Sequence, residues 1–427
     1  MSITRGVLTA AAAVAVGSAG VVAAAPTHAA DASQRNCAWT VELDPDGVNA
    51  LYPDRAARYW VLDLPASPKD SLRINGIYPH ARYTSLTSYD SALRSADGIP
   101  DVDIAPDRGS SNPFRTGADR ATTARRRHYT VRVVMGRTPE HPARNTLYTE
   151  SSDGSRQGTT FLVALRIYEP DKGLPDDGGV PLPSVTLDTP AGRAPLPNCA
   201  TAPTPGSTNQ TVADAPAPVT GSGSTTAIVW HKFYNLPTAV ADNTEPAAAP
   251  ATMALPKGGF ADNPDNKYVS AVVSTARAPA VIIRGKLPVT PETFDRARRM
   301  PAAQLRYWSM CSNELASERF YGCLMDDQMP LAEGRHFTLV VTTAADRPAN
   351  AVTRCGVAWL PAGPAPDTVL IERNMLPQAT FRHSIQAARY GHEKHDLGAY
   401  YPAAHYATTA QVEKLGCHAP VNAPRRS

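Results

Sequence analysis

The chain has 427 residues and a formal net charge of +3, from 42 Lys and Arg against 39 Asp and Glu. So small an excess of positive charge argues against nucleic acid as a partner. The length is that of about two domains of ordinary size.

Residues 1–30 have the features of a secretory signal peptide. Arg5 supplies a positive start, residues 7–22 are rich in Ala and Val, and residues 27–30 offer small side chains to a signal peptidase. We therefore expect a secreted, extracellular protein. No later run is long and apolar enough to cross a bilayer, so we expect no membrane span.

The next segment, residues 31–194, is expected to form a first domain of short strands. Alternating side chains predict strands at residues 59–64, 72–77, 82–90, 129–134, 161–168 and 185–187. Residues 97–112 are rich in Asp, Pro, Gly and Ser and are expected to form a long loop. Short strands with Pro and Gly turns, and almost no helical periodicity, favour an antiparallel sandwich or barrel.

The second part of the chain follows a linker. Residues 195–226 are dense in Pro, Ala, Thr, Ser and Gly, which is typical of a linker. A second domain is expected at residues 227–418, with a tail at 419–427. Its predicted strands cover residues 227–234, 268–274, 307–311, 320–325, 337–342 and 369–371. Helices are predicted at residues 290–305, where Thr290 and Pro291 suit a helix start, and at 381–389.

The two domains repeat one another. Residues 72–79 (Leu-Arg-Ile-Asn-Gly-Ile-Tyr-Pro) correspond to residues 281–288 (Val-Ile-Ile-Arg-Gly-Lys-Leu-Pro). The motif Arg-Tyr-x-Ser occurs at residues 82–85 and again at 306–309, and further matches follow in the same order. We therefore expect an all-β protein of two tandem antiparallel, jelly-roll-like β-sandwich domains, with one or two short helices in the second.

Six cysteines remain after removal of the signal peptide. Their even number and the oxidising compartment make disulfides the expected use. The repeat helps to choose among the connectivities, because two cysteines bracket the first copy and two others lie on successive strand candidates. The predicted pairs are Cys37–Cys199, Cys311–Cys323 and Cys355–Cys417.

Two strands resemble those of a known group of domains. Residues 83–90 (Tyr-Thr-Ser-Leu-Thr-Ser-Tyr-Asp) resemble the aromatic-Trp-Ser-Leu-Thr-x-Tyr-Asp strand of secreted bacterial β-sandwich proteins of unknown function. Residues 165–170 (Leu-Arg-Ile-Tyr-Glu-Pro) are similar to their Leu-Arg-x-Tyr-x-Pro strand. The second copy keeps the Trp at Trp308 and departs at Asn313 and Met375. The resemblance implies a β-sandwich and no particular chemistry.

The strand at residues 82–90 is the leading candidate for a ligand site. Alternation gives one of its faces a row of hydroxyl groups with an aromatic ring at each end. The candidate residues are Arg82, Tyr83, Ser85, Thr87, Tyr89 and Asp90. Such a face could recognise a carboxylate or a sugar. The alternative is structural, because charged residues retained in both copies would form ion pairs that serve the fold.

The expected loop at residues 97–112 contains candidate metal ligands. Asp101, Asp103 and Asp107 could gather around Ca²⁺, which prefers several oxygen ligands. Their spacing does not match an EF-hand, and ordinary turn formation by Asp is the alternative.

A second candidate metal site lies near the C-terminus. His392 and His395, with His405 and His418 beyond them, could bind Zn²⁺. The spacing of the first two is one residue shorter than in the zincin motif, and solvated histidines are the alternative.

No catalytic motif is present in the sequence: there is no nucleophile elbow and no phosphate-binding loop. Two duplicated sandwiches without such a motif favour a secreted, non-catalytic binding or surface protein, with a small molecule or a glycan as its ligand. The alternative is a secreted hydrolase or metal-assisted enzyme with its site in one domain only. No cofactor is predicted apart from the two candidate metals, and the oligomeric state is left open.

Overall fold

The computed structural model describes residues 37–46, 49, 52–199, 227–233, 261–315, 317–422 and 424. The expected signal peptide and residues 200–226 of the expected linker lie outside this part of the chain. In the part described, no helix is long and apolar enough to span a membrane.

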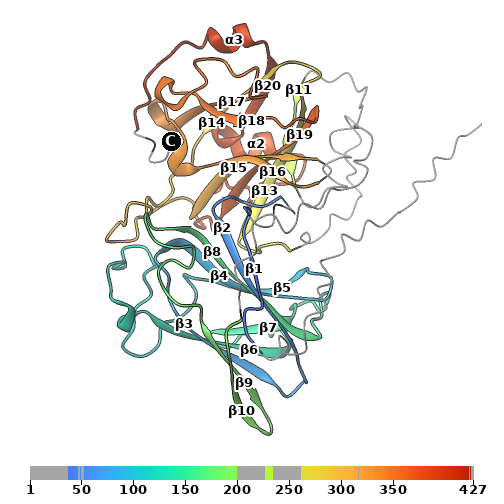
Figure 1. Ribbon diagram of the computed structural model, residues 1–427, viewed down its shortest axis with the longest axis vertical. Coiled ribbons are helices and arrows are strands. Elements are labelled where there is room, and N and C mark those ends of the chain that lie inside the picture. Colours follow the sequence, from blue (N-terminus) through green and yellow to red (C-terminus); the bar gives the residue numbers. More distant parts are fainter. Residues whose placement is uncertain are drawn as a thin grey trace, which may run out of the picture.

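The first half of the chain, up to Cys199, forms two five-stranded sheets (Figure 1). One sheet has the strand order β1 (Val41–Leu43), β2 (Ala57–Pro65), β8 (Thr160–Pro170), β4 (Ala81–Tyr89) and β5 (Ser95–Pro100). The other has the order β10 (Gly192–Leu196), β9 (Ser184–Thr189), β3 (Ser71–Ile77), β6 (His128–Arg137) and β7 (Thr146–Glu150).

The second half, from Ala227 onward, also forms two five-stranded sheets. One has the order β12 (His231–Lys232), β13 (Asn266–Ser274), β19 (Asp367–Met375), β15 (Tyr307–Glu314) and β16 (Phe320–Met325). The other has the order β11 (Ala227–Ile228), β20 (Ala403–Ala407), β14 (Ala280–Lys286), β17 (His336–Thr342) and β18 (Ala358–Pro361). The described residues of this half also form two short α-helices, α2 (Glu393–Leu397) and α3 (Thr409–Glu413).

The two halves match strand by strand, which confirms the expected all-β, multi-sheet fold. Tyr83 lies opposite Tyr168 in one half, and Tyr307 lies opposite Met375 at the same place in the other. The pairing is antiparallel apart from β6–β7 and the equivalent β17–β18, which run parallel. One sheet of each half is therefore mixed at one edge, whereas the other sheet is purely antiparallel as expected.

Each half has its own hydrophobic core between its two sheets. Trp60 and Leu62 of β2 face Ile74 of β3 and Val131 of β6 in the first half. These side chains alternate with more exposed ones along their strands, so one face of each sheet is apolar. The same arrangement in the second half gives two packed sandwiches (Figure 1).

All three predicted disulfides are present: Cys37–Cys199, Cys311–Cys323 and Cys355–Cys417. The first closes the first half, the second joins the neighbouring strands β15 and β16, and the third fixes the C-terminal segment to the second half.

Both predicted helices are wrong. Residues 381–389 form turns, and α2 follows them. Residues 290–305 run without helical structure along the first half, where Gly117 N donates to Met300 O at 2.8 Å and Met300 N donates to Ala118 O at 3.0 Å. The Met300 side chain packs into the core of the first half. Contacts with a distant segment therefore override the local preference for a helix start.

Two expected boundaries also differ from the structure. Strand β5 begins just before the expected loop at residues 97–112 and continues into it as far as Pro100. Strand β10 extends to Leu196, past the expected start of the linker at residue 195. In both places turn-forming residues lie within short edge strands, where they weaken the sequence signal for a strand.

Candidate functional site

The hydroxyl-rich face of β4 lies between the two halves. All nine residues of β4 are buried. Tyr83 and Tyr168 of the first half form one cluster with Tyr307 and Met375 of the second. The rings of Tyr168 and Tyr307 meet edge to face, with centroids 5.4 Å apart. The expected ligand face is therefore a contact surface between the two sandwiches.

Two ion pairs cross this contact surface in a reciprocal way. Arg82 Nη1 lies 2.9 Å from Asp326 Oδ1, and Arg306 Nη1 lies 2.7 Å from Asp101 Oδ1. Arg82 on β4 and Arg306, immediately before β15, occupy equivalent positions, and each aspartate follows the neighbouring strand, β5 or β16. Equivalent residues thus exchange partners, as across the twofold axis of a symmetric dimer.

The hydroxyl groups of the face follow the same pattern. Tyr83 Oη donates to Asp265 Oδ2 at 2.7 Å, and Tyr307 Oη donates to Asp54 Oδ1 at 2.7 Å. Asp54 also accepts a hydrogen bond from Ser309 Oγ at 2.6 Å. The equivalent tyrosines Tyr83 and Tyr307 therefore each donate to a carboxylate of the opposite half.

The electrostatics of the contact surface reflect this burial. Burial works to lower the pKa of Arg82, but the carboxylates of Asp326 and Glu169 outweigh it and hold the pKa above its ordinary value. Burial raises the pKa of Asp101 to about 6, although Arg306 opposes this. The pKa of Tyr83 is raised well above its usual range, first by burial and then by Asp265.

The rest of the predicted face is occupied as well. Arg166 Nη1 donates to Thr87 Oγ1 at 2.7 Å, and Arg166 also donates to Tyr89 Oη. Asp90 holds a turn, since it accepts from the Arg94 backbone N–H at 2.9 Å and pairs with the Arg94 guanidinium. Ser85 lies buried on the same strand. The six predicted ligand-binding residues lie on β4 or directly after it, and all six are buried from solvent.

The three candidate Ca²⁺ ligands do not converge. Asp101 is buried and paired with Arg306, Asp103 is exposed, and Asp107 accepts a hydrogen bond from Thr130 Oγ1 at 3.1 Å. In the described residues, the group of three metal-binding residue types that does gather is Asp54 with Cys311 and Cys323. The two cysteines form a disulfide and offer no thiolate.

The candidate Zn²⁺ ligands His392, His395, His405 and His418 are all exposed. His395 Nδ1 lies 2.9 Å from Asp396 Oδ1. These histidines do not form a cluster of potential ligands in the described part of the chain.

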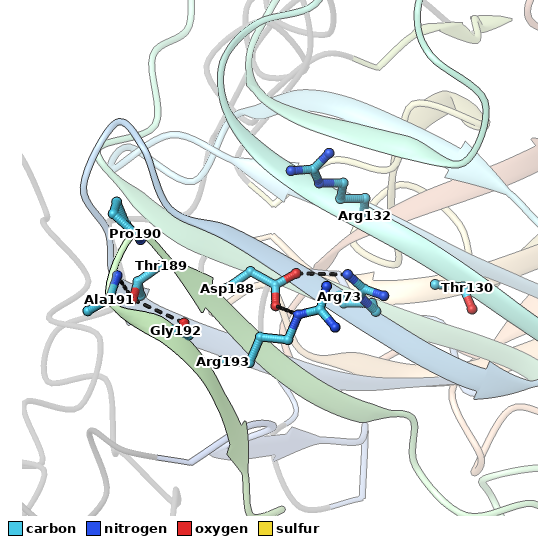
Figure 2. A pocket seen from close by; sticks show the side chains of 9 residues that line it. All are labelled: Arg73, Thr130, Arg132, Asp188, Thr189, Pro190, Ala191, Gly192 and Arg193. Atoms are coloured by element: carbon cyan, nitrogen blue, oxygen red, sulfur yellow. Dashed lines mark hydrogen bonds and ion pairs between the residues drawn. The ribbon is translucent and has the colours of Figure 1, made fainter.

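A hollow of about 650 Å³ lies on the outer face of the other sheet of the first half (Figure 2). Three arginines and one aspartate dominate its lining, and Thr130 and the β9–β10 turn complete it. The lining residues are Arg73, Thr130, Arg132, Asp188, Thr189, Pro190, Ala191, Gly192 and Arg193.

The charged side chains of this hollow form a row across four neighbouring strands. Asp188 on β9 lies between Arg193 on β10 and Arg73 on β3, and it pairs with both, with one N–O distance of 3.0 Å to each. Arg132 on β6 lies directly opposite Arg73 in the sheet. Among the described residues Arg132 makes no ion pair, and its guanidinium donates to Ser71 Oγ at 3.3 Å. The hollow thus carries more positive than negative charge.

The equivalent surface of the second half is closed and apolar. The sheet registers place Ile282 where the first half has Arg73, Val340 where it has Arg132, and Ala407 where it has Asp188. All three are buried in one cluster with Val412 of α3. The charged row therefore occurs in one copy only and is not needed to build the sandwich.

Sequence reasoning missed these residues although the signal was present. A comparison of the two copies shows Arg73 against Ile282 within the clearest repeat segment. The partners of Arg73 lie far away in the sequence, since Asp188 is 115 residues distant. Only the fold shows that they form one surface.

No protein-family model matches the chain, and no curated protein matches it. Among solved structures, it is similar to an uncharacterised protein from Burkholderia cenocepacia, with a TM-score of 0.47 and 10% identity over 89% of this chain and 84% of the other. It is also similar to the VPA0106 protein from Vibrio parahaemolyticus, with a TM-score of 0.35 and 11% identity over 84% of this chain and 92% of the other.

Proposed function

We propose that the chain is a secreted, non-catalytic binding protein that holds an anionic group of its ligand in the arginine-lined hollow of the first half. The observation that carries the proposal is the charged row of Arg193, Asp188, Arg73 and Arg132 on an open sheet face. Guanidinium groups bind carboxylate and phosphate oxygens with paired, charge-assisted hydrogen bonds.

The difference between the two copies supports this proposal. A surface that served only the fold would be expected in both halves, yet the second half has Ile282 and Val340 in place of Arg73 and Arg132. Like charges on directly opposed strand residues are also unfavourable for a sheet. Their presence in the first half is explained if an anion binds between them.

Secretion is part of the same proposal. It is supported by the three disulfides, which are typical of proteins that fold in an oxidising compartment. We also propose that the chain is a member of the secreted bacterial β-sandwich proteins that its strands at residues 83–90 and 165–170 resemble.

Calorimetric titration at low ionic strength tests the proposed function. The mature protein is titrated with acetate, inorganic sulfate and inorganic phosphate. We expect at least one anion to bind and Arg132→Gln to weaken that binding about tenfold, because a hydrogen bond to a charged group contributes about 1.5–3 kcal/mol. Arg132 is exposed, so the substitution leaves the core intact.

Arg125→Gln is the matched control, since Arg125 is an exposed arginine outside the hollow. Its affinity for anions should equal that of the unmodified protein. The proposed function is wrong if no anion binds, or if Arg125→Gln and Arg132→Gln weaken binding equally.

A further inference from the structure

We infer that the hollow takes a doubly charged oxyanion, the phosphate group of a phosphomonoester; this inference rests on the proposed function. Arg73, Arg132 and Arg193 bring three positive charges and Asp188 brings one negative charge, which leaves two positive charges to be balanced. Asp107 is hydrogen-bonded to Thr130 at 3.1 Å but does not itself line the hollow.

The guanidinium groups that line the hollow have N–H donors that remain available to a ligand. Asp188 accepts a hydrogen bond from Arg73 Nη2, and Arg193 Nε lies 3.0 Å from its other carboxylate oxygen, so most N–H groups of both guanidiniums have no carboxylate partner. Arg132 stands apart from this group in Figure 2 and pairs with no acid in the described chain. A phosphate group has three terminal oxygens, which suits more than one guanidinium at a time.

The position of Asp188 favours a phosphate over a carboxylate as the ligand group that binds in the hollow. Asp188 already supplies a carboxylate between Arg73 and Arg193. One carboxylate shared between Arg73 and Arg193 leaves one positive charge in excess, and Arg132, directly opposite Arg73 in the sheet, adds a second. A second carboxylate there would leave one positive charge unbalanced, whereas a phosphomonoester above its second pKa of about 6 balances both.

The residues that line the hollow also indicate where the rest of the ligand lies. It contains no aromatic side chain, so no ring is present on which a nucleobase could stack. The hollow lies open on a sheet face, and Arg132 and Arg193 are exposed. The ligand is therefore recognised by its phosphate, while the group esterified to the phosphate extends into solvent.

Titration of the full mature chain at two pH values tests this inference. The probes are phenyl phosphate, whose charge changes from −1 to about −2 between pH 5 and pH 8, and methyl sulfate, whose charge stays at −1. We expect the affinity for phenyl phosphate to rise about tenfold from pH 5 to pH 8, while that for methyl sulfate stays constant. Inorganic phosphate, as a third probe, should bind about as tightly as phenyl phosphate at pH 8, because the esterified group extends into solvent; much weaker binding would contradict recognition by the phosphate group.

Two variants of Arg132 distinguish the contribution of its positive charge from that of its paired N–H donors. Arg132→Lys keeps the charge and loses the paired donors, so it should bind phenyl phosphate more weakly but keep the pH dependence. Arg132→Gln should lose most of the pH dependence as well. The inference is overturned if methyl sulfate binds as tightly as phenyl phosphate at pH 8, a result that leaves the proposed function standing. If no probe binds, both fail.

Discussion

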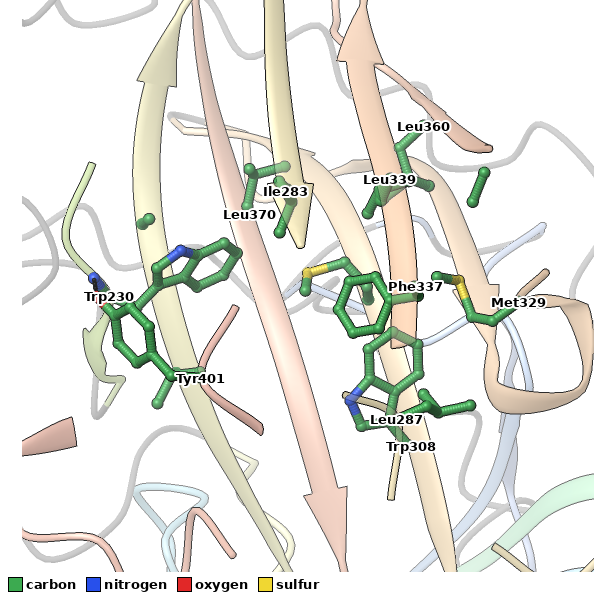
Figure 3. Close-up of a cluster of buried hydrophobic side chains, with 14 of the residues drawn as sticks. Trp230, Ile283, Leu287, Trp308, Met329, Phe337, Leu339, Leu360, Leu370 and Tyr401 are labelled. Carbon is green, nitrogen blue, oxygen red and sulfur yellow. Dashed lines mark hydrogen bonds between the residues drawn. The ribbon is translucent and has the colours of Figure 1, made fainter. Parts of the chain in front are cut away.

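At the scale of single residues, the most unusual side chain of the second half is Glu372. It lies two residues from Leu370 along β19 and opposite Met310 on β15, and both of these residues belong to the core that Figure 3 shows, where Leu370 is labelled. The first half has Leu165 at this place. Burial raises the pKa of Glu372 to about 8, although hydrogen bonds from Trp308 and Asn374 act in the opposite direction. The carboxyl group is thus held protonated near neutral pH.

This group makes the stability of the protein depend on pH. The pKa of Glu372 is about 8 in the folded protein, against an ordinary value of 4.5. Its contribution to stability is therefore complete below about pH 4.5 and is lost as the pH rises to about 8, at about 1.4 kcal/mol per pH unit. Glu372→Gln should flatten this part of the profile, as measured by urea denaturation from pH 5 to pH 9.

The residue that the first half has at this position suggests a second substitution of Glu372. Glu372→Leu introduces the residue of the first half and should raise stability most at pH 8 and above. Glu413→Gln, an exposed glutamate of α3, is the control and should leave the profile unchanged. A pH profile of Glu372→Gln that equals that of the unmodified protein would show that this carboxyl group is ionised in the fold.

At the scale of strands, the Gly–aromatic pair of the repeat has a packing explanation. Gly76 on β3 lies opposite Tyr129 on β6, and Gly285 on β14 lies opposite Phe337 on β17. Each ring lies over the backbone of its glycine. A methyl group on Gly76 would lie 2.3 Å from Tyr129, and one on Gly285 would lie 3.0 Å from Phe337. Each glycine therefore leaves room for the ring opposite it.

We predict that Gly76→Ala destabilises the protein by about 1–3 kcal/mol, because the buried Tyr129 ring must move away. Gly285→Ala should cost less, since the closest approach is longer there. Chemical denaturation of the two variants measures both free energies of unfolding. Equal costs, or none at Gly76, would contradict this account.

The strands and disulfides could be predicted because their signals are local or are repeated. Alternation marked β3 and β6, and the repeat aligned the cysteines Cys37 and Cys199 with the ends of one copy. The segment at residues 290–305 was mispredicted because its partners belong to the other half. The hydroxyl-rich strand was expected to bind a ligand, whereas it is buried between the two halves. Arg82 meets Asp326 across 244 residues of sequence, and no local pattern shows that contact.

At the scale of the whole molecule, the two sandwiches are joined by the reciprocal contact surface between β4 and β15. The ion pairs Arg82–Asp326 and Arg306–Asp101 are almost completely buried. Removal of a partner from either pair removes buried, charge-assisted contacts between the halves, although Arg82 keeps Glu169 of its own half as a second carboxylate partner. The two halves are therefore expected to unfold together.

We predict that Asp326→Asn lowers the free energy of unfolding by about 2 kcal/mol, because Arg82 loses a charged hydrogen-bond partner but keeps the Glu169 carboxylate. Unfolding should still be a single transition that involves both halves. Hydrogen exchange of β6 and β17, one in each half, should accelerate to the same extent. Asp176→Asn removes an exposed aspartate that pairs with Arg58, and should cost less than about 1 kcal/mol. Faster exchange in β17 alone would show that the halves unfold independently.

The central claim is that the open sheet face of the first half binds an anionic ligand group while its counterpart in the second half is closed. The most direct measurement is a crystal structure of the mature protein with phenyl phosphate. We predict a phosphate within hydrogen-bond distance of Arg73 and Arg132, with no ligand over Ile282 and Val340. A phosphate bound elsewhere, with the hollow empty, would contradict the claim.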